Sequence, residues 1–171
     1  MELFFLGIDP SATSSGITII SSSSNTTHRS LLIKPRKLRD ASRLHYISSE
    51  IKNFIADTPV QMCVYESPSY GSVHKEFILG EVLGVIKLTL HELNINLVDV
   101  PPTQLKKYFT GRGGATKSDM IAAAQRLGCT SNQEDICDSY AAAILCKDLH
   151  VGPLLDTRAS REVRKALLDN L

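Results

Sequence analysis

The sequence places four carboxylates where strands are expected to end or a helix to begin. Residues 3–9 are apolar until they stop at Asp9, and residues 61–66 stop in the same way at Glu66. Asp135 and Asp138 are three residues apart, a spacing that puts both on one face of a helix. A carboxylate at the carboxyl end of a buried strand lies at the sheet edge where ligands bind in open α/β sheets. We therefore expect the four acids to converge.

Four converging carboxylates predict metal chemistry. They repel one another strongly unless a cation neutralises them, and oxygen ligands suit hard divalent cations such as Mg²⁺ or Mn²⁺. Two such ions, about 3.5–4 Å apart, can activate a water and stabilise the leaving oxygen of a phosphodiester. Singly, each acid also fits an ordinary role as a helix-capping, strand-end or surface charge. Their conjunction predicts a metal-dependent nuclease whose catalytic, metal-binding acids are Asp9, Glu66, Asp135 and Asp138.

The apolar pattern supplies elements that could position these acids. Three strands in succession favour an antiparallel meander, followed by helix, strand, helix and strand, and then by helices. This order predicts an α/β fold with a five-stranded mixed sheet, its first three strands antiparallel, flanked by helices as in the ribonuclease H-like fold. We expect one domain over residues 1–171, with a core of about 3–150 and a helical tail over 151–171. The expected strands are residues 3–9, 16–22, 28–33, 61–66 and 95–100, and the expected helices are 37–56, 75–93, 103–109, 117–127, 134–149 and 160–168.

The composition is that of an ordinary globular chain, with 43% hydrophobic and 22% charged residues. The apolar start ends at Asp9 and Pro10, too early for a signal peptide or a membrane span. The cysteines form no CxxC pair and have no histidine at zinc-finger spacing, which favours reduced thiols over structural zinc. We expect a cytoplasmic protein without a membrane segment.

Net charge is only +1, but basic residues cluster locally. Residues 29–52 hold seven basic residues against two acids, which fits a solvated face or a DNA contact equally well. A glycine-rich loop over residues 110–115 lies between Lys106 and Lys117 and could approach a phosphate backbone closely. Lys117 begins a helix, whose N-terminus favours anions. For Lys107 and Arg112, DNA contact and ordinary solvated charge are equal alternatives.

The motifs resemble those of the RuvC family, the Holliday junction resolvases of bacteria and some phages. The matching segments are LGIDPSATSSGI, VYESP, LGEVLGVI, PPTQLKKYFTGRGGATK and EDICDSYAAAIL, in an order that holds from about residue 3 to residue 150. The resemblance implies a ribonuclease H-like fold and a homodimer that nicks a four-way DNA junction symmetrically with Mg²⁺ or Mn²⁺. It maps the family's four acids onto the four named above and its two functional lysines onto Lys106 and Lys117.

The chain departs from the family pattern after Glu66. The cellular enzymes carry a phenylalanine three residues past the glutamate, which stacks on bases at the junction. Ser69 holds that position here, and the aromatic residue is Tyr70. Stacking of a base on Tyr70 is the expected substitute, with a relaxed or different sequence preference.

The helix expected over residues 75–93 is predicted to form the dimer. Its two glycines, Gly80 and Gly84, allow close approach. We expect part of its apolar stripe to pack on its own sheet and the rest on a twofold mate. That stripe comprises Ile78, Leu79, Val82, Ile86, Leu90 and Leu93.

Three other functions compete. A ribonuclease H-like nuclease acting on another nucleic acid, such as an RNA–DNA hybrid, fits the fold, but the LGEVLG helix that forms the RuvC dimer argues against it. A catalytically weak junction-binding protein would not need all four acids. An actin-like ATPase is suggested by a loose phosphate-loop pattern at GIDPSATSSG, but that fold needs two such domains, more than 171 residues supply.

Overall fold

The computed structural model describes residues 2–67 and 73–169, and its centre is one five-stranded sheet in the order β3-β2-β1-β4-β5. β1 pairs antiparallel with β2, and β2 pairs antiparallel with β3. β4 is parallel to β1, and β5 is parallel to β4. The predicted mixed sheet with three antiparallel strands is therefore confirmed. The strands are β1 (Phe4–Asp9), β2 (Ser15–Ser21), β3 (Arg29–Ile33), β4 (Val60–Glu66) and β5 (Asn96–Val100).

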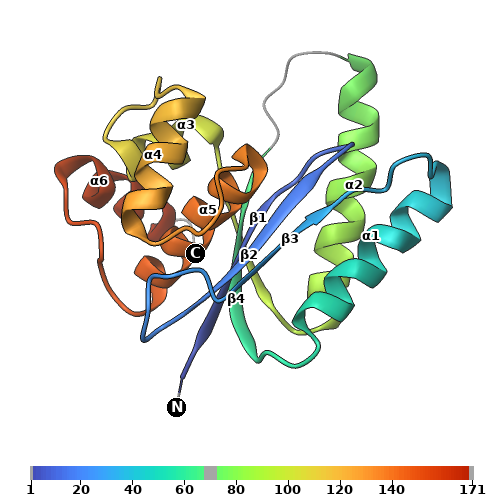
Figure 1. Cartoon of the computed structure of the whole chain (residues 1–171), viewed down its shortest axis with the longest axis horizontal. Helices are drawn as coiled ribbons and strands as arrows, with labels where there is room; N and C mark the ends of the chain where they lie inside the picture. Colours follow the sequence, from blue (N-terminus) through green and yellow to red (C-terminus); the bar gives the residue numbers. More distant parts are fainter. Residues whose placement is uncertain (1, 68–72, 170–171) are drawn as a thin grey trace.

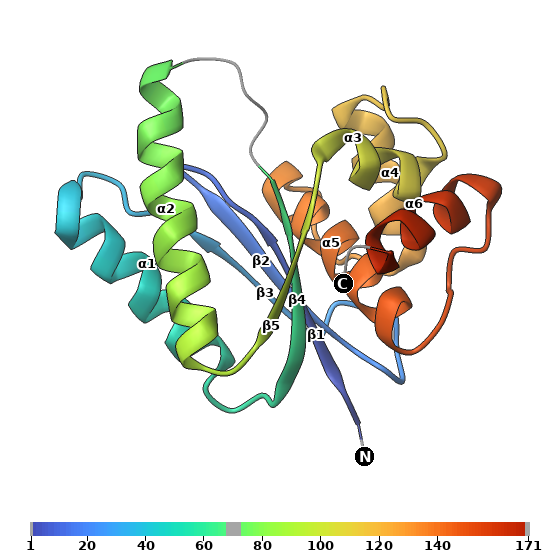
Figure 2. The same cartoon turned by 180° about the vertical axis from the view of Figure 1, so that it is seen from behind.

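The helices lie on both faces of this sheet. α1 and α2 cover one face, and α3 to α6 gather on the other (Figure 1), as the reverse view also shows (Figure 2). α1 begins three residues later than expected, because Arg39 has an extended backbone and Asp40 has a left-handed φ of 48°. The helices are α1 (Asp40–Ile55), α2 (Val73–Glu92), α3 (Pro102–Thr110), α4 (Lys117–Leu127), α5 (Glu134–His150) and α6 (Arg158–Leu168).

Each face of the sheet has its own core. Successive side chains on a strand point to opposite faces, so Phe5 packs in the core beneath α5, whereas Leu6 and Ile8 pack beneath α1 and α2. α5 is buried along most of its length, which is why its sequence shows so little polar periodicity. No helix in the described part of the chain combines the length and apolarity needed to cross a membrane.

Two glycines let the backbone of α5 touch the sheet. A Cβ atom at Gly7 would lie 1.9 Å from the carbonyl oxygen of Ser139, and one at Gly16 would lie 1.9 Å from that of Asp135. A buried hydrogen bond of 2.8 Å between the hydroxyls of Thr18 and Ser139 joins the same surfaces. The first turns of α5 are thereby held against the ends of β1 and β2.

The outward face of α2 differs from the predicted stripe. Val82, Ile86 and Leu90 are buried in the core of the chain's own sheet. The exposed side instead carries Phe77 and Leu88, whose exposed fractions are 74% and 57%. Gly80 and Gly84 also face open space, because a Cβ atom at either would meet nothing within 4 Å. Part of the predicted stripe thus packs on the chain's own sheet, as expected, while Phe77 and Leu88 add exposed apolar side chains that the stripe did not include.

The C-terminal tail is fastened to the domain through a buried carboxylate. The Tyr108 hydroxyl donates to Asp148 at 2.6 Å, and the backbone N–H of Leu154 donates to the same carboxylate at 2.8 Å. The guanidinium of Arg164 on α6 forms an ion pair of 3.5 Å with the same Asp148 carboxylate. α3, α5 and α6 are therefore joined at one charged centre.

Candidate active site

The strand ends and the start of α5 bring the four predicted acids to one edge of the sheet. Asp9 ends β1 and Glu66 ends β4, and these neighbouring strands run parallel, so both carboxylates lie at the same edge. Gly16 pairs with Asp9 across β1 and β2 and touches the backbone of Asp135. Asp138 follows on the next turn of α5. The convergence expected from the sequence is present in the structure.

Burial and mutual repulsion raise the pKa values of three of these acids. Desolvation raises the pKa of Asp9 well above its ordinary value, and repulsion from Glu66 and Asp138 adds to the shift. Burial, with repulsion from Asp138, raises the pKa of Glu66 to about 7. Burial, followed by repulsion from Glu134, raises the pKa of Asp138 to about 6. The acids therefore form one electrostatic cluster in which full ionisation is unfavourable without a cation.

The donor set fits a hard divalent cation. All the donors are carboxylates, the ligands that Mg²⁺ and Mn²⁺ prefer. Oδ1 of Asp138 is buried without a hydrogen-bond partner in the described part of the chain, so a ligand for it would satisfy an otherwise costly atom. Among the described residues, no three acid, histidine or cysteine side chains are already spaced to hold a metal ion. The carboxylate ligands of a cation site are thus gathered in one place, but among the described residues they are not yet at the distances of a formed coordination shell.

Two lysines, Lys106 and Lys117, border the acids. Lys106 lies close enough that its charge opposes the upward pKa shifts of Glu66 and Asp138. Lys117 begins α4 and forms an ion pair of 2.7 Å with Glu134. The hydrogen bond to Glu134 raises the pKa of Lys117, so this lysine stays protonated at the rim of the cluster.

The other predicted DNA contacts lie elsewhere or outside the described residues. Lys107 forms an ion pair of 2.7 Å with Glu162 of α6. Arg112 pairs at 3.2 Å with Asp119, which also caps α4. These partners place both cations in surface ion pairs, and their contact with DNA stays a prediction. Tyr70 lies outside the described residues.

The structure adds three residues that the sequence did not single out. Glu134 joins the cluster and holds Lys117. Ser14 donates a hydrogen bond of 2.6 Å to Oδ2 of Asp135 and so fixes one carboxylate. Gly16 provides the close approach of α5. Glu134 could have been suspected because it lies beside Asp135, and a glycine inside a β-branched strand often marks a close backbone approach. Nothing in the sequence singled out Ser14.

The raised pKa of Glu66 gives a testable dependence of stability on pH. Because the folded protein holds this proton more tightly than the unfolded chain, its stabilising contribution is full below about pH 4.5 and lost as the pH rises through about 7. Without divalent cations, we expect Glu66→Gln to gain stability relative to wild type, by on the order of 1–2 kcal/mol, between about pH 5 and pH 8.

Thermal unfolding of both proteins in a chelating buffer measures this difference. Glu162→Gln is the matched control, because the Lys107 hydrogen bond lowers rather than raises the pKa of Glu162. If the stability gained by Glu66→Gln over wild type were the same at about pH 5 and at about pH 8, the proposed electrostatic repulsion within the acid cluster would be contradicted.

Comparison with solved structures defines the class to which this fold belongs. The structure described as T. thermophilus RuvC in complex with Holliday junction substrate superimposes with a TM-score of 0.73 at 17% identity, covering 82% of this chain and 90% of that one. The yeast mitochondrial Holliday junction resolvase Ydc2 gives a TM-score of 0.57 at 12% identity, covering 96% and 81%. The fold is the ribonuclease H-like fold, as predicted.

Sequence comparison then shows the family. The profile described as crossover junction endodeoxyribonuclease RuvC matches residues 5–146. A protein with that name from Chlorobium phaeovibrioides is 30% identical over 156 residues, covering 86% of this chain and 82% of the relative. Another from Hydrogenovibrio crunogenus is 32% identical over 151 residues, covering 85% and 87%. The chain belongs to the RuvC family.

Proposed function

We propose that this protein is a structure-selective DNA endonuclease that resolves four-way Holliday junctions, as the names of its relatives indicate for those proteins. The observation that carries the proposal is the acid cluster at the carboxyl ends of β1 and β4. Three of its acids, Asp9, Glu66 and Asp138, are buried enough to raise their pKa values, and two lysines border it. A site that concentrates negative charge beside cations suits a phosphodiester whose cleavage needs a bound cation. The four free, buried cysteines support a location in a reducing compartment such as the cytoplasm.

The residues divide into two roles in this proposal. Asp9, Glu66, Asp135 and Asp138 would hold Mg²⁺ or Mn²⁺, which activates water and stabilises the leaving oxygen when bound. Ser14 orients Asp135 through its hydrogen bond, which restricts the rotation of this carboxylate before a cation binds. Lys106 and Lys117 would position the scissile phosphate and offset its developing charge. Lys117 must exchange its partner Glu134 for the phosphate in this step.

A cleavage assay tests this proposal directly. The protein is incubated with a synthetic four-way junction and Mg²⁺, in parallel with a linear duplex of the same sequence and with a chelator-treated sample. The expected result is paired nicks in opposing arms of the junction, little cutting of the duplex and no cutting without the cation. Equal cutting of junction and duplex would refute selectivity for structure, and cutting in chelator would refute dependence on a cation.

We propose further that the active form is a homodimer joined through the outer face of α2. This face carries Phe77 and Leu88 with Gly80 and Gly84 between them, a combination of exposed apolar side chains and open backbone. Paired cuts across a twofold-symmetric junction need two sites, and a twofold interface supplies them.

Leu88→Glu is expected to dissociate this dimer, because it places two charges in the centre of an apolar contact. Light scattering at increasing protein concentration should show a dimeric mass for wild type and a monomeric mass for the variant. Lys87→Glu is a neighbouring control, since Lys87 lies over the Tyr65 ring of its own chain. A monomeric wild type at high concentration, or a Leu88→Glu variant that stays dimeric, would refute this interface.

A further inference from the structure

The loop between β3 and α1 carries an unusually dense set of uncompensated cations. Lys34, Arg36, Lys37 and Arg39 lie in the loop, and Arg43 follows on the first turns of α1. None of the five forms an ion pair among the described residues, in contrast to Lys107, Arg112 and Lys117 elsewhere. The single acid within this segment is Asp40. In the part of the chain that the structure describes, these charges therefore have no ion-pair partner.

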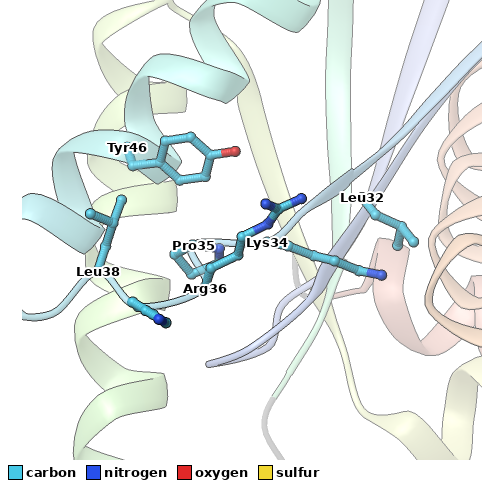
Figure 3. Close-up of a pocket in the computed structure, with 7 residues that line it drawn as sticks. Leu32, Lys34, Pro35, Arg36, Leu38 and Tyr46 are labelled. Atoms are coloured by element: carbon cyan, nitrogen blue, oxygen red, sulfur yellow. The ribbon is translucent and has the colours of Figure 1, made fainter.

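These cations are mostly exposed and line two adjoining pockets that are open to solvent. One has a volume of about 640 Å³, and Figure 3 shows Tyr46 of α1 facing it together with side chains of the loop. The second, of about 660 Å³, is lined by Arg36, Lys37, Arg39 and Arg43 and continues to Ala12 and Thr13. Among the described residues, no acidic side chain lines either pocket. We name these adjoining pockets the basic groove.

The basic groove lies at the same sheet edge as the acid cluster. Ile33, the last residue of β3, pairs with Ser15, and Gly16 beside it pairs with Asp9. Two strand spacings, about 10 Å, therefore separate the end of β3 from the end of β1. Thr13 of the groove also precedes Ser14, which holds Asp135.

The backbone of the loop gives a second indication. Arg36 has a φ of 51°, a left-handed conformation that side chains other than glycine and asparagine rarely adopt. An arginine at a position where glycine would be less strained points to a use for its side chain.

We propose that the basic groove binds the sugar-phosphate backbone of the DNA arm that leaves the acid cluster, an inference that rests on the proposed function. The five cations contact phosphates, and Pro35, Leu38 and Tyr46 supply apolar walls for the sugars. The groove positions DNA without reading bases, so it contributes affinity that weakens with salt and takes no part in bond cleavage.

The dependence of junction binding on salt tests this proposal. Lys34→Gln combined with Lys37→Gln removes two groove charges and avoids the strained position of Arg36. Each lost phosphate contact lowers the slope of log affinity against log salt by about 0.9, so the slope should fall by about 2. Single-turnover cleavage at saturating protein and low salt should stay near the wild-type rate.

The matched control is Arg161→Gln combined with Lys165→Gln, two exposed cations of α6 in the other layer. This variant has the same net charge and should keep the wild-type slope. An unchanged slope in the groove variant, or an equal fall in the control, overturns the groove assignment. A wild-type protein that neither binds nor cuts the junction overturns the proposed function instead, so the two failures can be told apart.

Discussion

Asp9→Asn is expected to abolish junction cleavage while leaving junction binding at least as tight as in wild type. Asp9 ends β1 at the centre of the acid cluster, where burial, together with repulsion from Glu66 and Asp138, raises its pKa. The substitution keeps the shape of the side chain but removes a charged oxygen ligand. Loss of several kcal/mol of transition-state stabilisation corresponds to a rate lower by about a thousand-fold or more. Binding should not suffer, because one negative charge fewer opposes the phosphates.

Gel shift without metal and cleavage with Mg²⁺, both on the same junction, separate these effects. Asp57→Asn removes the same charge from an exposed turn and should change neither quantity. Lys117→Ala should lose activity by another route, through poorer positioning of the phosphate at the rim. Nicking by Asp9→Asn at a rate near that of wild type would refute the metal-site assignment and leave a junction-binding protein.

Gly7→Ala is expected to lower the free energy of unfolding by about 3 kcal/mol or more, at the upper end of overpacking effects. The added Cβ atom would lie 1.9 Å from the carbonyl oxygen of Ser139 and 2.3 Å from the backbone nitrogen of Ala143. Both obstacles are backbone atoms of α5, so no side chain can rotate away. The helix must retreat from β1, which opens a gap in the core and displaces the first turns that carry Asp135 and Asp138.

Urea denaturation of wild type and variant measures the loss, and junction cleavage measures the displacement. Gly114→Ala is the control, because its Cβ atom would meet nothing within 4 Å and its stability should change by about 0.5 kcal/mol or less. A Gly7→Ala protein within about 1 kcal/mol of wild type would show that α5 does not depend on this approach.

The strand pattern predicted the core of the site because a buried strand that stops at a carboxylate specifies both an element and its end. Asp9 and Glu66 could be paired before the structure was known for that reason. The i, i+3 spacing of Asp135 and Asp138 likewise specified one helix face. The sequence pattern did not predict the distance between α5 and the sheet. The contacts of Gly7 in β1 and Gly16 in β2 show how closely the helix approaches.

Other parts of the site could not be predicted, because they depend on pairings between distant residues. Lys107 has its partner Glu162 on α6, and Lys117 has its partner Glu134 on α5. A lysine next to a glycine-rich loop looks the same in sequence whether it faces a neighbouring helix or open solvent. In α2, apolar residues are mixed with the exposed polar ones, so no purely polar face marked the outside and Phe77 and Leu88 were overlooked.

The charged centre at Asp148 makes the tail part of the active site's scaffold. Lys106 belongs to α3, whose Tyr108 is bonded to Asp148 and whose Lys107 is paired with α6. The matched family region ends at residue 146, before this carboxylate and before all of α6. A chain cut at that boundary would keep every acid of the cluster, yet the helix that carries one of its two lysines would lose its outer support. We therefore expect substitutions in the tail to alter how firmly Lys106 is placed, although they leave every acid of the cluster unchanged.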